Sequence, residues 1–252
     1  MNNKTRFALA LIVFGVGFTI GLIFNTQAVW TDLEGMSFWG YPEATSFDQS
    51  IEIDGELSPL QCPVLITSHE VATVKIRVTN KTDNQINPWL QASISKPGER
   101  DSLVRHKQEL ILAPRETKTM SWEVSNENTL LNRSIFVRTF LFKIENYPPS
   151  LTRHCGIMVR DFGSLTGTQI ILLVVISSLV LMGVGWWLWW SNLVPMRRRE
   201  NRVVMILGFM FALNTISFVS NLMGNLVISG FALVLTALSL IAIVETFAYH
   251  RN

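Results

Sequence analysis

Charged side chains are absent from three long stretches of this 252-residue chain: residues 7–24, 162–196 and 203–244. About 20 consecutive apolar residues are enough for a helix to cross a bilayer. The mean hydropathy of +0.30 and the hydrophobic content of 48% are also high for a soluble protein. These features argue against a wholly soluble protein and predict several membrane-spanning helices.

Motifs of catalysis are missing as well. The sequence contains no glycine-rich phosphate loop, no paired metal-ligand histidines and no nucleophile elbow. Its four histidines are scattered, at His69, His106, His154 and His250. We therefore predict a non-enzymatic protein with no cofactor and no metal.

The charges that are present are divided unevenly. Residues 25–166 hold 14 of the 21 basic residues and 17 of the 19 acidic ones. The other basic residues are Lys4, Arg6, Arg197, Arg198, Arg199, Arg202 and Arg251. Basic residues mark the cytoplasmic side of a span. We therefore attribute the net charge of +2 to the basic residues that set the membrane topology, and we see no sign of nucleic-acid binding in it.

Four spans place all seven of these basic residues in the cytoplasm. The predicted spans are residues 7–24, 168–190, 203–220 and 226–247. Cytoplasmic parts are the termini 1–6 and 248–252 and the basic loop 191–202, and residues 25–166 lie outside. Asn221–Asn225 is too short for a domain and joins the last two spans as a hairpin. We expect an integral, multi-pass plasma-membrane protein whose first partner is the lipid bilayer.

The span 168–190 carries its own orientation signal, because tryptophan favours the headgroup level and clustered arginine the cytoplasmic side. The predicted membrane-interface anchors are Trp186, Trp187, Trp189, Trp190, Arg197, Arg198, Arg199 and Arg202. These arginines could also bind anionic lipid headgroups, at about 1 kcal/mol per residue, although topology alone accounts for them.

The first apolar run leaves two interpretations open. Residues 1–28 could be a cleaved signal peptide, with Met1–Arg6 as its basic start. The apolar core of a signal peptide usually has about 7–15 residues, whereas Phe7–Phe24 has 18. We favour a retained anchor, and both interpretations place residues 25–166 outside the cytoplasm.

Residues 25–50 form a juxtamembrane segment rich in aromatic side chains: Trp30, Phe38, Trp39 and Tyr41. These rings could rest in the outer headgroup layer or cover the base of the external domain. The sequence does not decide between the two.

Cys62 and Cys155 are the two cysteines of the chain, and both lie in the external segment. Two thiols in an oxidising compartment predict a disulfide bond. Closing a loop of this length would stabilise the fold by ~4–5 kcal/mol through chain entropy. A metal pair, two free thiols, or a nucleophilic Cys155 beside His154 are the alternatives.

Residues 51–161 predict an all-β domain. Apolar and polar side chains alternate in Val74–Val78 and Met120–Val124, as in half-buried strands. Ser134–Glu145 is apolar on both faces, which is typical of a central strand. Lys96–Lys107 holds seven ionisable side chains and is interpreted as a solvated loop or hairpin tip. Further strands are expected in 51–54, 62–67, 89–94, 110–112 and 155–159. Eight or nine short strands predict an antiparallel sandwich.

Two motifs in this domain resemble the immunoglobulin-like repeats of prokaryotic surface proteins. The first is a strand end, Val74-Lys-Ile-Arg-Val-Thr-Asn80-Lys-Thr-Asp83, and the second a turn, Leu112-Ala-Pro114-Arg-Glu116, with Trp122 after it. Arg115 stands where the repeats have glycine, and the cysteines are not spaced as in antibody domains. The resemblance implies a binding or spacer module and transfers no catalytic residue. The fold class is therefore a mixed membrane protein, with four transmembrane α-helices and an immunoglobulin-like β-sandwich between helices 1 and 2.

Asn80 and Asn132 each begin an N-glycosylation tripeptide on the translocated side. Glycans are plausible there in a eukaryotic secretory membrane. In a bacterial protein the tripeptides would be polar turns.

The third span contains a polar face at helical spacing: Asn214, Ser217 and Asn221. Polar groups in hydrocarbon need internal partners, so this face should look at another helix. We interpret it as a candidate interhelical polar face, and a polar track is the alternative. No ionisable residue lies in the middle of any predicted span, although proton relays and ion-coupled carriers usually need one.

Three functional hypotheses follow. The first is a non-enzymatic interaction or assembly subunit, whose external domain binds another membrane or envelope protein or a surface glycan. The second is a transport or channel accessory subunit, or a small permease, that uses the polar face of the third span. The third is a membrane enzyme for lipid or envelope substrates, and it requires a cleft that collects His154, His69 and external carboxylates.

Overall fold

The structure is a computed structural model. It describes residues 3–40, 54–98, 103–131, 133–143, 151–191 and 198–248. The chain divides into two compact units, which are described separately. The helical unit comprises Met1–Val29 and Gln169–Asn252, and the β unit comprises Trp30–Thr168.

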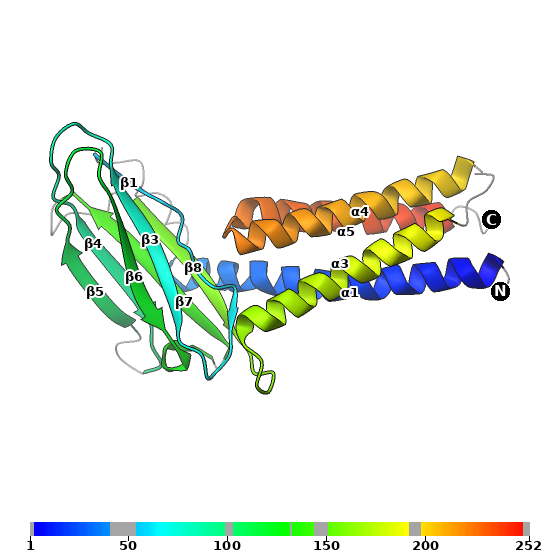
Figure 1. Ribbon diagram of the computed structural model, residues 1–252, viewed down its shortest axis with the longest axis horizontal. Helices are drawn as coiled ribbons and strands as arrows, with labels where there is room; N and C mark the ends of the chain where they lie inside the picture. Colours follow the sequence, from blue (N-terminus) through cyan, green and yellow to red (C-terminus); the bar gives the residue numbers. More distant parts are fainter. Residues whose placement is uncertain are drawn as a thin grey trace. The chain divides into compact units, whose positions relative to one another are not determined.

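Four helices are described, labelled as in Figure 1: α1 Asn3–Phe38, α3 Gly167–Ser191, α4 Arg198–Leu222 and α5 Leu226–Ala248. Three are long and apolar enough to cross a membrane: Thr5–Phe38, Gly167–Ser191 and Val203–Leu222. The described apolar part of α5, Leu226–Ala242, is shorter. The helices are compatible with a membrane protein, while the fourth crossing and the topology stay predictions.

Helices α4 and α5 are joined by a tight turn. Gly224 has a φ of +69°, a left-handed conformation that glycine adopts without strain. The side-chain oxygen of Asn225 accepts a hydrogen bond from the N–H of Ile228 at 3.2 Å. Asparagine in this position caps the start of a helix, so the local sequence accounts for both the end of α4 and the start of α5.

Glycine allows α1 and α3 to approach closely within the helical unit. A Cβ atom at Gly17 would lie 2.6 Å from Leu181 Cβ, and one at Gly185 would lie 2.6 Å from the Phe14 nitrogen. Contacts this short do not occur between real side chains, so larger residues would push the helices apart. Gly17 and Gly21 have the small-xxx-small spacing common in membrane helix pairs.

The β unit contains two sheets. Their strands are β1 Gly55–Leu57, β2 Leu65–Ile66, β3 Ala72–Asn80, β4 Trp89–Ser95, β5 Leu103–Glu109, β6 Thr117–Val124, β7 Ser134–Phe142 and β8 Leu151–Val159. One sheet has the order β1-β3-β6, and the other has the order β2-β8-β7-β4-β5. As predicted, the strand that begins at Ser134 lies inside its sheet, between β8 and β4.

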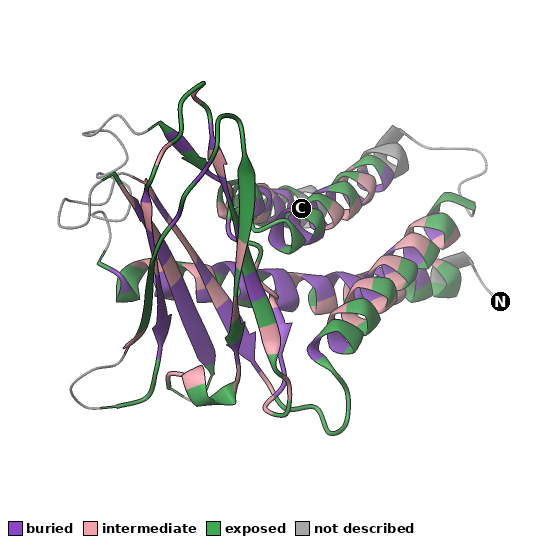
Figure 2. Cartoon of the chain, turned by 60° about the vertical axis from the view of Figure 1, so that its left-hand side comes forward, coloured by how far each residue is buried: buried purple, intermediate pink, exposed green. Residues whose placement is uncertain are grey.

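The two sheets share one hydrophobic core. Alternate residues of β3 are fully buried, and alternate residues of β7 belong to the same core. A two-residue side-chain period leads to this pattern. Figure 2 shows this as buried positions along the middle strands. The core residues of the central strands include Val74, Ile76, Val78, Leu90, Ile94, Ile135, Val137, Leu141 and Ile157.

The last turns of α1 belong to the β unit and pack on its five-stranded sheet. The carboxylate of Asp32 accepts a hydrogen bond from the Gly156 N–H at 2.8 Å. The ring of Phe38 lies 5.2 Å from that of Phe136, and the guanidinium of Arg138 lies 4.4 Å above the ring of Trp39. Phe38 and Trp39 therefore cover part of the β unit, as in the second of the two interpretations of these aromatics. Tyr41 lies outside the described residues.

Four features differ from the sequence prediction. Residues 110–112, expected to form a strand, contribute only an isolated bridge between Leu112 and Ile86. Helix α1 continues from the predicted span end at Phe24 to Phe38, because sheet contacts support its last turns. Leu103–Glu109 is strand β5 and not part of a loop, since an edge strand can be polar on both faces. Strand β2 pairs with β8 in parallel, so the arrangement is not purely antiparallel. The strand expected at 51–54 falls almost wholly outside the described residues.

Candidate functional site

A chain of hydrogen bonds runs through the helical unit and links α4, α1 and α3. Asn221 donates from Nδ2 to Asn25 Oδ1 at 2.8 Å, and Asn25 donates to Asn214 Oδ1 at 2.9 Å. Asn214 donates to Ser178 Oγ at 3.3 Å, and Ser178 donates to the Gly17 carbonyl at 2.8 Å. We call Asn25, Ser178, Asn214 and Asn221 the polar ladder. All four residues are buried.

The helical period brings these side chains together. Asn214 and Asn221 are two turns apart on α4, so they lie on one face. On α1, Asn25 lies one turn beyond Gly21. A Cβ atom at Gly21 would collide with the Asn214 amide and lie 2.6 Å from Ser178 Oγ. Glycine at this position therefore makes the space in which the ladder forms.

Ser217, the remaining residue of the predicted polar face, has a different partner. Its hydroxyl oxygen lies 3.0 Å from that of Ser229 on α5, and both residues are buried. The polar face thus contacts α1 and α3 through its asparagines and α5 through its serine.

Chemically, the ladder is a set of mutually satisfied amide and hydroxyl groups. Each amide donor in it already has an acceptor within the helical unit. Buried polar groups that satisfy one another fix helix positions, whereas a transport path needs groups that can exchange partners with a substrate. The geometry therefore favours a structural role for these side chains.

The predicted tryptophan anchors have two environments. Trp187 and Trp190 are more than half exposed, as interface residues would be. Trp186 donates from Nε1 to the Val204 carbonyl at 3.3 Å, and Trp189 is buried with its ring against Phe7. Two tryptophans thus face outward, and two pack against neighbouring helices.

Little is described for the predicted arginine anchors. Arg197 lies outside the described residues. Arg198, Arg199 and Arg202 are in the first turns of α4, without described side chains. Their contacts with lipid stay predictions.

In the β unit, Cys62 and Cys155 form a disulfide bond that joins positions 93 residues apart in the chain. Cys155 lies on β8 at the margin of the hydrophobic core, and Cys62 packs against that core. Because its sulfur is bonded to Cys62, Cys155 is not a nucleophile that His154 could activate. The bond ties the segment before β2 to β8.

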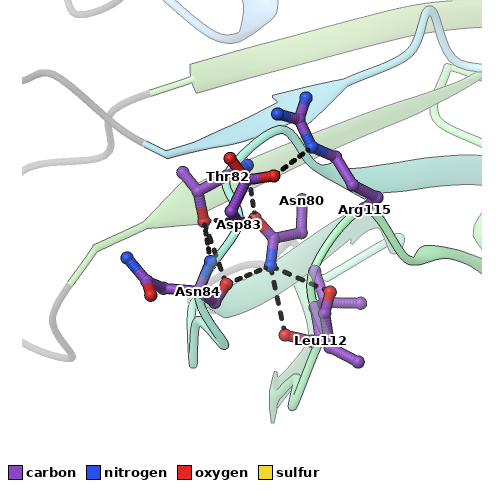
Figure 3. Close-up of polar contacts among 7 residues, drawn as sticks. Asn80, Thr82, Asp83, Asn84, Leu112 and Arg115 are labelled. Carbon is purple, nitrogen blue, oxygen red and sulfur yellow. Dashed lines mark hydrogen bonds and ion pairs between the residues drawn. The ribbon is translucent and has the colours of Figure 1, made fainter.

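The strand-end and turn motifs meet in one place in the β unit (Figure 3). Asn80, fully buried, donates from Nδ2 to the carbonyls of Asn84, Leu112 and Ala113, at 2.7, 3.3 and 2.9 Å. Its Oδ1 accepts from the N–H and hydroxyl of Thr82, at 2.9 and 2.8 Å. Asn80 is therefore a structural residue that joins two turns, and its amide nitrogen has no room for a glycan. Asn132 lies outside the described residues.

Arg115, which stands where the resembling repeats have glycine, has a φ of +62°. Its side chain pairs with Asp83 at 2.9 Å, and both groups are largely exposed. The turn thus keeps the left-handed conformation that glycine would favour.

The two histidines of the enzyme hypothesis lie apart, although Glu70 and Asp161 lie near His69. The Nδ1 atom of His69 lies 3.1 Å from the Ser68 hydroxyl, which donates to the Asp161 carboxylate, and its Nε2 lies 3.3 Å from the Gly163 carbonyl. His154 lies seven residues before Asp161, and extended chain of that length spans roughly 20 Å. The structure does not bring His69 and His154 into one cleft.

Local contacts shift the pKa values of three of these groups. Burial, with the charges of Arg138 and Arg153, lowers the pKa of His154 below 6.5. Hydrogen bonds from the Ser68 hydroxyl and N–H lower the pKa of Asp161. Burial raises the pKa of Glu70, but hydrogen bonds from the N–H groups of Gly167 and Thr67 and the Thr67 hydroxyl outweigh it, so the net shift is downward.

Strand β5 presents an open edge in the β unit. It is the last strand of its sheet and pairs with β4 alone among the described strands. Arg105, His106, Lys107 and Gln108 are exposed, and the ammonium of Lys107 lies 5.2 Å from the centre of the Trp89 ring. Two cationic side chains, Arg105 and Lys107, thus lie on this edge with one carboxylate, Glu109, and the Trp89 ring belongs to the inner neighbour β4.

No protein-family model and no curated protein matches the chain. Among solved structures, the CARDB domain of a Pyrococcus furiosus protein, in complex with di-metal ions, is similar at 11% identity and a TM-score of 0.33. The match covers 44% of this chain and 97% of that domain.

Two larger proteins are similar over about the same share of the chain. A β-glucosidase from Erythrobacter marinus has 15% identity and a TM-score of 0.32, with 42% of this chain and 15% of the glucosidase covered. The alkylpurine DNA glycosylase AlkC from Pseudomonas fluorescens, bound to DNA, has 8% identity and a TM-score of 0.31. That match covers 43% of this chain and 31% of AlkC. Similarity at these TM-scores carries no functional argument.

Sequence reasoning missed two members of the polar ladder as partners of Asn214. Asn25 falls in the predicted juxtamembrane segment, and the sequence assigns no partner to Ser178. A four-residue period in Gly17, Gly21 and Asn25 could have revealed the face of α1 that receives the ladder.

Proposed function

We propose that this chain is a non-enzymatic binding subunit of a membrane complex. Its β unit is an immunoglobulin-like sandwich, inserted between the first and second spans and held outside the cytoplasm. The sandwich binds an extended, acidic segment of a partner protein, and the helices anchor it in the membrane.

The observation that carries this proposal is the open edge of β5. A seven-residue edge strand offers a row of backbone N–H and C=O groups to which another strand can add. Arg105 and Lys107 outnumber Glu109 on this strand, so its net charge is positive. A positive edge favours an acidic partner segment and disfavours self-association of identical edges.

The helical unit supports an anchoring role by its internal contacts. Asn214 and Asn221 each bond to Asn25, Asn214 also donates to Ser178, and the Ser217 hydroxyl bonds to that of Ser229. Among the described residues, these groups are committed to neighbouring helices. This weakens the hypothesis of a transport path along Asn214, Ser217 and Asn221.

Site-specific photo-crosslinking in native membranes tests the proposal. A photoreactive side chain at His106 or Gln108 should form an adduct with the same partner protein. The control position is Lys75 on β3, which has Ser121 on one side and Gln61 on the other and so has no open edge.

A charge variant sharpens this test. Lys107→Glu should reduce the adduct at Gln108 several-fold, whereas Lys118→Glu on exposed β6 should leave it unchanged. Equal adducts at Lys75 and Gln108, or no adduct at either β5 position, would contradict the proposal.

A further inference from the structure

Exposed apolar side chains of the β unit gather at one end of it. Outside α1, the exposed large apolar residues in the described part of the β unit are Val71, Ile111, Leu131, Phe162 and Leu165. Scattered single residues of this kind are normal on protein surfaces. They indicate a binding surface only if they lie together.

Four of the five lie at the end where the chain enters α3. Val71 follows Glu70, whose carboxylate accepts the N–H of Gly167, the first residue of α3, at 2.7 Å. Leu131 precedes Arg133, whose carbonyl accepts the N–H of Val159 at the end of β8, at 2.8 Å.

Phe162 and Leu165 belong to the short link between β8 and α3. Ile111 lies at the opposite end, beside Leu112, which bridges to Ile86 near the start of β4.

Two more exposed apolar residues extend this end along α1. Arg133 pairs with Glu34 of α1, and Trp30 and Leu33, on the turns just before it, are 60% and 46% exposed. Trp30 donates its indole N–H to Glu34 at 2.7 Å, so its ring is held in place while its surface stays open. Tryptophan in this position is typical of the membrane interface.

The distance to the apolar span is short. Ile170 begins the uncharged run of α3, and Leu165 precedes it by five residues. Even a fully extended link of that length covers only about 17 Å, and a helical turn covers much less. The polar interfacial layer of one leaflet is itself about 5–8 Å deep. Side chains on this link are therefore within reach of the lipid.

We propose that Trp30, Leu33, Val71, Leu131, Phe162 and Leu165 form a lipid collar, which contacts the outer headgroup layer of the membrane. The partner is the bilayer surface and not a protein. This inference requires that α3 crosses a membrane, but it does not depend on the binding of a partner at β5.

The backbone at Leu131 is consistent with this role. Leu131 is 79% exposed and has a φ of +52°, a left-handed conformation that is unfavourable for leucine. In water, the exposed side chain of Leu131 contributes no free energy that would offset the backbone strain. Insertion of this side chain into lipid would be favourable.

Single-cysteine labelling tests the collar. Because Cys62 and Cys155 are bonded to each other, the full chain offers a background without free thiols. Leu131→Cys, Phe162→Cys and the control Ile111→Cys carry a polarity-sensitive fluorophore in phosphatidylcholine vesicles, with and without spin-labelled lipid.

At positions 131 and 162 we expect a blue-shifted emission that spin-labelled lipid quenches, and at position 111 neither effect. Emission at 131 and 162 equal to that at 111 would overturn the proposal. If these positions are shielded in native membranes but open in vesicles, a protein covers them and the lipid assignment is wrong. A second pair, Val71→Cys against Lys75→Cys, keeps the test valid should one labelled variant fail to fold.

Discussion

Asn25 and Asn214 contact each other inside the helical unit, with Asn25 Nδ2 2.9 Å from Asn214 Oδ1. Each is also bonded to a third residue, Asn221 or Ser178. The contact is therefore the middle link of the polar ladder, and its removal should loosen α1 from α4.

Asn25→Ala and Asn214→Ala should each destabilise the protein by about 1 kcal/mol, within the usual range for interhelical hydrogen bonds in membranes. The double variant should cost less than the sum, because both changes remove the same bond. Unfolding in mixed micelles measures these values. Thr215→Ala is the control, since its hydroxyl bonds within α4 to Phe211. Full additivity of the two asparagine changes would argue against direct coupling.

Gly21→Ala should be far more damaging than Gly15→Ala. A Cβ atom at Gly21 meets Asn214 and Ser178, whereas one at Gly15 meets nothing within 4 Å. Both changes carry the same gain in helix propensity, so the difference isolates the space that the ladder needs. We expect a loss of about 1–3 kcal/mol for Gly21→Ala, as in other overpacked sites. Equal stability of the two variants in mixed micelles would show that the ladder does not need this space.

The predictable parts of the fold were those set by local patterns. The alternation in Val74–Val78 predicted β3 because strands have a two-residue period, and the length of the uncharged apolar runs predicted the helices. The two cysteines predicted their own pairing because there was no competing thiol. These features depend on few long-range contacts.

The parts that could not be predicted depend on contacts between distant segments. β5 has no apolar alternation, since an edge strand that lies beyond the core has no buried face to mark it. The end of α1 is set by contacts with Gly156 and Phe136, which follow it by roughly a hundred residues. Asn25 acquires its role only when Asn214 and Asn221 face it.

Arg115→Gly should be more stable than Arg115→Ala. Both variants lose the exposed pair with Asp83, which is worth little. Only glycine relieves the left-handed backbone at φ +62°, and the difference should be about 1 kcal/mol. Thermal unfolding of the full chain measures it. A more stable alanine variant would mean that this turn is not left-handed.

Asn80→Ala should destabilise the β unit by about 2–3 kcal/mol, because it leaves buried carbonyls and the Thr82 N–H without their partner. Asn84→Ala is the matched control, since Asn84 joins this cluster through its backbone carbonyl. In a host that glycosylates, mass spectrometry should find no glycan at Asn80 of the folded protein. A glycosylated, folded Asn80 would refute the structural role assigned to it.

The contribution of His154 to the stability of the β unit should fall as the pH drops below 6.5. The pKa of His154 in the folded state is lower than its ordinary value of 6.5, so the unfolded state takes up the proton first. The His154 contribution is therefore complete above pH 6.5 and is lost as pH falls toward and through the folded pKa. The slope cannot exceed about 1.4 kcal/mol per pH unit for one group.

Thermal unfolding on both sides of pH 6.5 checks this effect. His154→Gln should flatten the pH dependence in that window, whereas His106→Gln, at an exposed position, should leave it unchanged. The same slope in the His154 variant and the parent protein would assign the effect to another group.

The central claim is that residues 25–166 lie outside the cytoplasm, and thiol labelling in intact cells tests it most directly. Thr119→Cys places an exposed thiol on β6, and Ser191→Cys places one at the end of α3. The account predicts that a membrane-impermeant maleimide labels position 119 in intact cells and position 191 only after lysis, while Cys62 and Cys155 do not react without reductant. Labelling of position 119 that appears only after lysis would contradict the account.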